Sequence, residues 1–125
     1  AATILDAAGL ATTQYPLHGM PFVEAAVQGT SPLRDHVTVG WGSSVTVIDD
    51  RWWLNCKVDG TGALLHDLSS ARPLERSVAH EELEVARRLY QVALKDAEGG
   101  FPDWLVQLAR GHEDAPGCTA LTGRM

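Results

Sequence analysis

R-W-W-L-N-C-K-V, residues 51–58, is the stretch that decides the fold. Alternate side chains of a β-strand point to opposite faces, so this run has one apolar face and one more polar face. The apolar face consists of Trp52, Leu54, Cys56 and Val58, and the polar face of Arg51, Trp53, Asn55 and Lys57. Turn residues flank the run, with D-D at 49–50 and D-G-T-G at 59–62. The pattern predicts the central strand of an antiparallel sheet.

Three neighbouring segments predict further strands. Together with the central run they give strands at 36–41, 44–48, 51–58 and 63–67. The three connections are short, which permits antiparallel neighbours and excludes parallel crossovers. We therefore expect a four-stranded antiparallel meander between residues 37 and 68.

Helices are predicted before and after the sheet in the sequence, at 3–10, 21–27, 78–97 and 102–110. The longest has an apolar stripe at three- and four-residue steps, formed by Leu83, Ala86, Tyr90, Ala93 and Leu94. Ser77 is the expected N-cap of this helix. The stripe should cover the apolar face of the central strand. The expected fold class is therefore α+β, a small four-stranded antiparallel sheet packed with helices.

The chain of 125 residues is the right size for one domain. We divide it into a helix-turn-helix lead-in at 1–35, the sheet with its C-terminal helices at 36–111, and a mobile tail at 112–125, with the first two parts forming one domain. The sequence begins A-A-T-I without an initiator methionine, so we expect it to start inside a longer protein. Nothing in it indicates a cellular compartment.

Composition argues against two classes of partner. The formal net charge is −6 and no basic cluster is present, which disfavours nucleic acid. No apolar run approaches the roughly 18 residues needed to span a membrane. Two cysteines are too few for a disulfide scaffold. Cys56 is expected to be a buried free thiol, and a Cys56–Cys118 bridge stays open as the alternative.

No catalytic constellation is apparent. The five histidines match no zinc spacing, and His66 and Asp67 should point to opposite faces of a strand. His80 and Glu84 stand four residues apart and are interpreted as a solvated helix pair. G-W-G-S-S at 40–44 is neither a nucleophile elbow nor a nucleotide-binding loop. We expect no catalytic residue, metal or cofactor site in this chain.

Three motifs in order resemble the C-terminal part of the sulfatase family, in the alkaline phosphatase superfamily. They are T-I-L-D-A-A-G-L at 3–10, L-H-G-M-P-F at 17–22, and L-L-H-D-L at 64–68 followed by P-L-E-R-S at 73–77. The family writes similar segments as P-T-I-L-D-L-A-G-L, L-D-G-x-S-L and E-L-Y-D-L…D-P-x-E-x-x-N. The chain departs at Ala2, His18 and Met20, where the family usually has proline, aspartate and arginine.

The resemblance implies that this chain is the non-catalytic C-terminal subdomain of a sulfatase-like hydrolase. It implies a parent that hydrolyses sulfate or phosphate esters with a divalent metal, calcium or similar, and a formylglycine nucleophile. Those parts lie upstream in the family, so the chain alone is expected to be inactive and to brace its own N-terminal catalytic domain. The alternative is a stand-alone α+β interaction or dimerisation module, and a small metal hydrolase is a third hypothesis.

Two groups of site residues follow. Arg51, Trp53, Asn55 and Lys57, on the polar face of the central strand, are predicted to be an interface with the catalytic domain. Cover by other parts of the same chain is the competing explanation for an aromatic residue there. His36 and Trp41 are predicted at the rim of the parent's substrate cleft. Because a domain separated from its partner exposes apolar surface, self-association is also expected.

Overall fold

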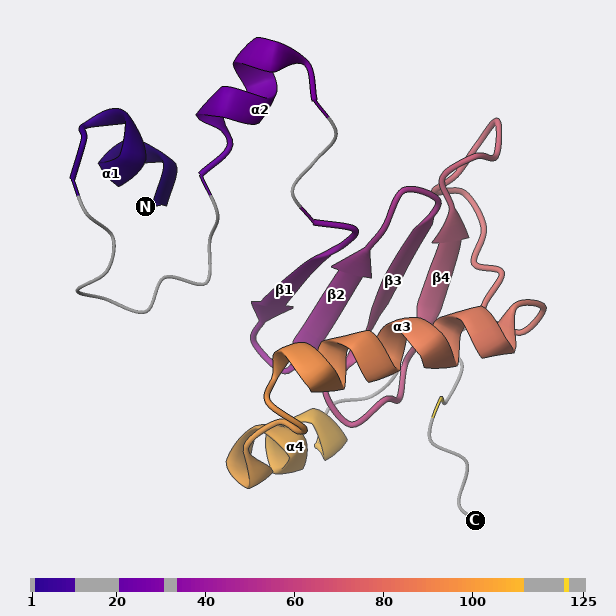
Figure 1. The fold of residues 1–125 in the computed structure, drawn as a ribbon. Helices are drawn as coiled ribbons and strands as arrows, with labels where there is room; N and C mark the ends of the chain where they lie inside the picture. Colours follow the sequence, from indigo (N-terminus) through magenta and orange to yellow (C-terminus); the bar gives the residue numbers. More distant parts are fainter. Residues whose placement is uncertain (1, 11–20, 31–33, 112–120, 122–125) are drawn as a thin grey trace. The chain divides into compact units, whose positions relative to one another are not determined.

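The computed structural model describes residues 2–10, 21–30, 34–111 and 121. The chain divides into two compact units, residues 1–35 and 36–125. Within the described ranges there are four helices and four strands (Figure 1). The fold class is α+β with a four-stranded antiparallel sheet, as the sequence predicts. The predicted tail at 112–125 lies outside the described residues, except for Leu121.

The first unit contains two short helices, α1 (Ala2–Ala7) and α2 (Val23–Gln28). Helix α2 ends at Gly29, whose φ of 64° is left-handed and is readily adopted by glycine. Helix α1 is shorter than the predicted 3–10, because residues 8–10 turn back onto it. The Leu10 N–H donates to the Leu5 carbonyl at 2.9 Å, and Gly9 has a φ of 67°. Both helices therefore end in the manner of a glycine cap.

The second unit is built on the sheet. Its strands are β1 (Val37–Trp41), β2 (Ser44–Ile48), β3 (Trp52–Lys57) and β4 (Leu64–Asp67), paired in sequence order. Two helices follow, α3 (Leu83–Asp96) and α4 (Asp103–Arg110). Helix α3 lies across one face of the sheet and packs on β2 and β3 (Figure 1). The predicted strand boundaries agree with these to within one residue.

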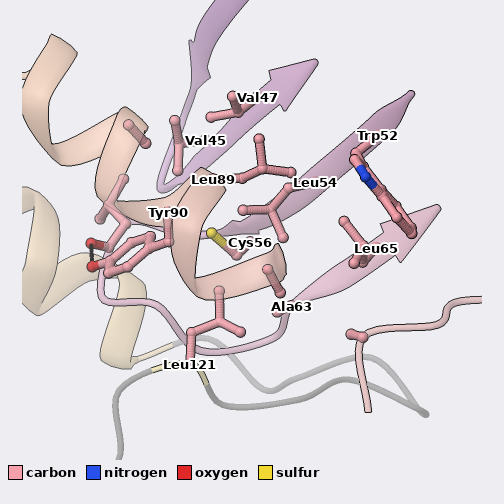
Figure 2. Close-up of a cluster of buried hydrophobic side chains, with 14 of the residues drawn as sticks. Val45, Val47, Trp52, Leu54, Cys56, Ala63, Leu65, Leu89, Tyr90 and Leu121 are labelled. Carbon is pink, nitrogen blue, oxygen red and sulfur yellow. Dashed lines mark hydrogen bonds between the residues drawn. The ribbon is translucent and has the colours of Figure 1, made fainter. Parts of the chain in front are cut away.

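The core lies between that face and the helices (Figure 2). Strands β2, β3 and β4 contribute Val45, Val47, Trp52, Leu54, Cys56 and Leu65, and α3 contributes Ala86, Leu89, Tyr90 and Ala93. The Tyr90 hydroxyl satisfies its buried oxygen by donating to the Val58 carbonyl at 3.0 Å. Cys56 is free and buried, as expected from its place on the apolar parity. The predicted stripe omitted Leu89, which is fully buried.

Helix α3 starts five residues later than predicted, at Leu83 instead of 78, and Ser77 is not its N-cap. The Ser77 hydroxyl oxygen instead accepts from the Leu65 N–H at 3.1 Å and the Ala79 N–H at 3.3 Å. The Val78 N–H donates to the Leu65 carbonyl at 2.8 Å. Residues 77–78 are thus used to complete the outer edge of β4, and this tertiary role overrides the local capping signal.

Candidate functional site

The face of the sheet opposite α3 is the candidate site, and we call it the open face. Strand pairing places its residues in three cross-strand rows. These rows are Val37–Ile48–Trp53–His66, Val39–Thr46–Asn55–Leu64, and Trp41–Ser44–Lys57. The face therefore contains six large apolar side chains, one lysine, one histidine and no carboxylate, in a protein of net charge −6.

Exposure on the open face increases toward β1. Val37 is 45% exposed, Val39 50% and Trp41 86%. The side chains on β2, β3 and β4 are only partly exposed, because each has a neighbouring strand on both sides or the 76–78 segment beside it. The most accessible apolar surface of the sheet thus lies along its β1 edge.

Trp53 occupies the centre of the first row, between Ile48 and His66. Its ring meets the His66 ring edge-on, with centroids 6.2 Å apart and an interplanar angle of 63°. The His66 ring is itself held by a 3.1 Å hydrogen bond between Nδ1 and the Arg76 carbonyl. The indole N–H of Trp53 is shielded from solvent and has no acceptor among the described residues. This donor is a local cost in the isolated chain.

The second row is polar at its centre. The Asn55 side-chain N–H donates to the Thr46 hydroxyl at 2.8 Å, which fixes both groups on the face. Val39 and Leu64 flank this pair on the outer strands. An apolar surface with a few oriented hydrogen-bonding groups is typical of the centre of a protein interface.

Three of the four predicted interface residues share the open face, namely Trp53, Asn55 and Lys57. Arg51 does not join them, because it precedes β3 and its guanidinium binds elsewhere. Its Nη2 donates to Asp67 Oδ2 at 3.0 Å, and its Cζ lies 4.6 Å from the ring centroid of Trp52, on the helix-covered side. The Arg51 side chain, followed by hydroxyl and backbone hydrogen bonds from Ser69, lowers the pKa of Asp67 to about 2.

The two predicted rim residues lie on opposite faces of β1 and at its opposite ends. Trp41 is on the open face. His36 points to the side of α3, where its Nε2 is 3.0 Å from Asp96 Oδ2. Thr38 on the same side donates to that oxygen at 2.5 Å. The hydrogen bond from Thr38, followed by that from His36, lowers the Asp96 pKa despite partial burial.

Sequence reasoning did not include Val37, Val39, Ile48, Leu64 and His66 in the site. Their signal was present, because the two-residue turn at 42–43 and the alternation of β1 determine which residues lie beside Trp53. The strand register set by this turn predicts their place on the open face.

The described part of the chain offers few groups for metal binding or nucleophilic chemistry. No group of three or more His, Cys, Asp or Glu side chains is placed to hold a metal ion there. Burial raises the pKa of the Cys56 thiol to about 12, so it is not a thiolate at neutral pH. None of the described helices has both the length and the apolar character to cross a membrane.

No protein-family model, curated protein or solved structure matches this chain.

Proposed function

We propose that this chain is the non-catalytic C-terminal subdomain of a sulfatase-like hydrolase, and that its open face docks on the catalytic domain. The ordered motifs at 3–10, 17–22 and 64–77 support the family. The observation that carries the docking role is the contrast between the two faces of one sheet. One is covered by α3, and the other leaves Val37, Val39 and Trp41 exposed.

The charge composition of the open face indicates the kind of partner surface that it would bind. The strand residues that form the open face include no carboxylate, although the chain has 16 acidic residues. Depletion of charge with enrichment in aromatic residues is the composition of an interface core. The partner surface should therefore be largely apolar, with hydrogen-bonding groups opposite Asn55.

The test of the role is a binding experiment with the protein encoded immediately upstream. If the source reading frame begins at Ala1, there is no catalytic domain to dock and the proposal is wrong. If a long coding region precedes it, that region is expressed separately and titrated with this chain. Trp53→Asp should weaken binding at least tenfold, because it buries a charge in the interface. Circular dichroism would verify that the variant is folded.

Trp104→Asp is the matched control. Trp104 is 66% exposed on α4, whose Leu105, Val106 and Ala109 pack against the core on the α3 side. Equal weakening of binding by both substitutions would show that the docking surface is not the open face. Hydrolysis of nitrophenyl sulfate or nitrophenyl phosphate by the purified chain, above a blank, would contradict a non-catalytic role. The parent activity, and its divalent metal, are tested in the joined protein.

A stand-alone interaction or dimerisation module is the second candidate. The exposure of three apolar side chains on β1 favours it, because large exposed apolar groups on one strand mark interaction sites. It predicts a reading frame that supplies no hydrolase domain, with association carried by this chain alone.

A further inference from the structure

The two edges of the sheet differ in how their backbone groups are satisfied. At β4, the outward N–H and carbonyl of Leu65 are both bonded, to the Ser77 hydroxyl at 3.1 Å and to the Val78 N–H at 2.8 Å. Asp67 ends this short strand with a charge. Covering segments and charges are the usual means of preventing edge-to-edge pairing, so β4 is closed to another strand.

Among the described residues of its own unit, the β1 edge has neither protection. A two-residue turn with Gly42 at a φ of 56° joins Trp41 to Ser44, which makes this flanking pair a hydrogen-bonded one. Hydrogen-bonded and non-hydrogen-bonded pairs alternate, so Thr38 and Gly40 direct their N–H and carbonyl groups away from β2. Within the described ranges no residue bonds these backbone groups. The strand, V-T-V-G-W, contains no charge and no proline.

This edge is complementary to itself. Thr38 and Gly40 are equidistant from Val39, so a two-fold axis at Val39 pairs Thr38 of one copy with Gly40 of the other. The two such pairs form four backbone hydrogen bonds, which use every outward group of the strand. On the open face the same axis sets Val39 against its own copy and Val37 against Trp41. We propose that β1 is a homodimerisation strand that joins two copies of this chain, antiparallel, into one eight-stranded sheet.

The side chains permit this pairing. On the helix side Thr38 would stand opposite a glycine, and a Cβ added at Gly40 would have no atom within 4 Å, so there is space at this position. The Asp96 carboxylate nearest the edge is already bonded by Thr38 and His36. On the open face, Val37, Val39 and Trp41 of one copy would lie against the same three side chains of the other. None of these six side chains is charged, so no like charges oppose each other across the axis. A five-residue strand buries less than a standard interface, so the dimer is weak and concentration-dependent.

Sedimentation equilibrium on the 125-residue chain tests the association. From roughly 10 μM to 1 mM, the average mass should increase from 13.5 kDa toward twice that value. Val39→Lys, which sets two lysines against each other at the axis, and Gly40→Pro, which removes two of the four hydrogen bonds, should each raise the dissociation constant at least tenfold. Val27→Lys is the matched control, because Val27 is 82% exposed on α2 and outside the strand. It should leave association unchanged.

Cysteine cross-linking tests the register. In a Cys118→Ser background, Val39→Cys places two thiols across the axis at a non-hydrogen-bonded pair, and mild oxidation should produce a covalent dimer. Val37→Cys faces Trp41 of the other copy and should cross-link far more slowly. Cys56 is buried and should not cross-link, so it serves as an internal negative control.

Three results would overturn the proposal. They are a monomer at all concentrations, a dimer that survives both β1 substitutions, and equal cross-linking at positions 37 and 39. Protection of the Thr38 and Gly40 amides from hydrogen exchange only when the upstream domain is added would assign the edge to that domain instead. The dimer does not depend on the docking role, so Trp53→Asp should weaken docking at least tenfold and leave the β1 pairing intact.

Discussion

Trp52 and Trp53 are adjacent on one strand and have opposite surroundings. Trp52 is 8% exposed in a core that α3 completes, whereas Trp53 lies on a face that none of the described helices of its own unit covers. The difference is one of partners rather than of residue type, because both faces of β3 bear large aromatic rings. The covered face stabilises the fold, and the open face is the one for which we propose a binding role. Substitutions on the two faces should therefore separate stability from association.

Leu54→Ala should produce the largest effect. Leu54 is 0% exposed at the centre of the covered face, and truncating a core leucine leaves a cavity that costs about 3 kcal/mol in the free energy of unfolding. Urea denaturation measures it. Val39→Ala on the open face is the control and should change the free energy by less than about 0.5 kcal/mol at monomeric concentrations. Similar losses at both positions would mean that the open face is covered within the monomer.

Tyr90→Phe should give the next largest effect. It removes the buried hydrogen bond to the Val58 carbonyl and leaves that acceptor unsatisfied, at a cost of about 1.5 kcal/mol. Burial, followed by nearby Cys56 and Asp59, raises the pKa of Tyr90 to about 12. The folded state therefore keeps a proton that the unfolded state releases above its ordinary pKa of 10.0.

The unfolding free energy of the wild type should accordingly decrease as the pH rises from about 10 toward 12. Cys56 contributes in the same direction from its ordinary pKa of 9.0, because burial also raises its pKa to about 12. In Tyr90→Phe the decrease above pH 10 should be smaller, and the part due to Cys56 should persist. Thermal unfolding across this pH range measures both. An unchanged pH profile in the variant would contradict the buried position of the hydroxyl.

Asp49→Ala should destabilise the covered face indirectly, by about 1 kcal/mol. Asp49 Oδ1 accepts from the N–H groups of Arg51 and Trp52 at 3.0 and 2.6 Å, and Oδ2 accepts from Arg88 of α3 at 3.0 Å. The carboxylate therefore holds both the β2–β3 turn and the helix. Asp50→Ala, at the exposed neighbouring position, is the matched control and should have little effect.

Acid titration sharpens that prediction. Burial raises the pKa of Asp49, but the hydrogen bonds from Trp52, Arg51 and Arg88 outweigh it and the net pKa is lowered. The carboxylate's contribution is thus fully present above its ordinary pKa of 3.8 and is lost as the pH falls below that value. The difference in unfolding free energy between wild type and Asp49→Ala should shrink below pH 3.8. A constant difference would show that the carboxylate charge is not what holds the turn.

Much of the fold could be predicted because alternation is a strong signal in short antiparallel strands. The predicted β2, at 44–48, is correct residue for residue, and the apolar parity of β3 identified the covered face. The start of α3 could not be predicted, because Ser77 and Val78 are used by the edge of β4, which is distant in sequence. Arg51 illustrates the same limit. Its alternation with Trp53 indicates the open face, but its side chain instead forms an ion pair with Asp67.

The candidate site was less predictable than the fold, because a face is defined by pairing across strands. Trp53, Asn55 and Lys57 could be grouped from one strand alone, but their neighbours on β1 and β4 required the register. His36 and Trp41 were grouped by nearness in sequence, although their odd spacing of five residues places them on opposite faces of β1.

Trp41→Ser should have the smallest effect on stability and is the most discriminating test of the comparison. Trp41 is 86% exposed, so its replacement removes almost no buried surface and should change the unfolding free energy by less than about 0.5 kcal/mol in dilute solution. Its role is in association, because the β1 pairing places its ring over Val37 of the second copy. The variant should therefore unfold like the wild type at low concentration and lose the additional stability that the wild type gains at high concentration. A large loss in dilute solution would mean that the ring is already covered within one chain, and the two faces of the sheet would then not differ in the way described.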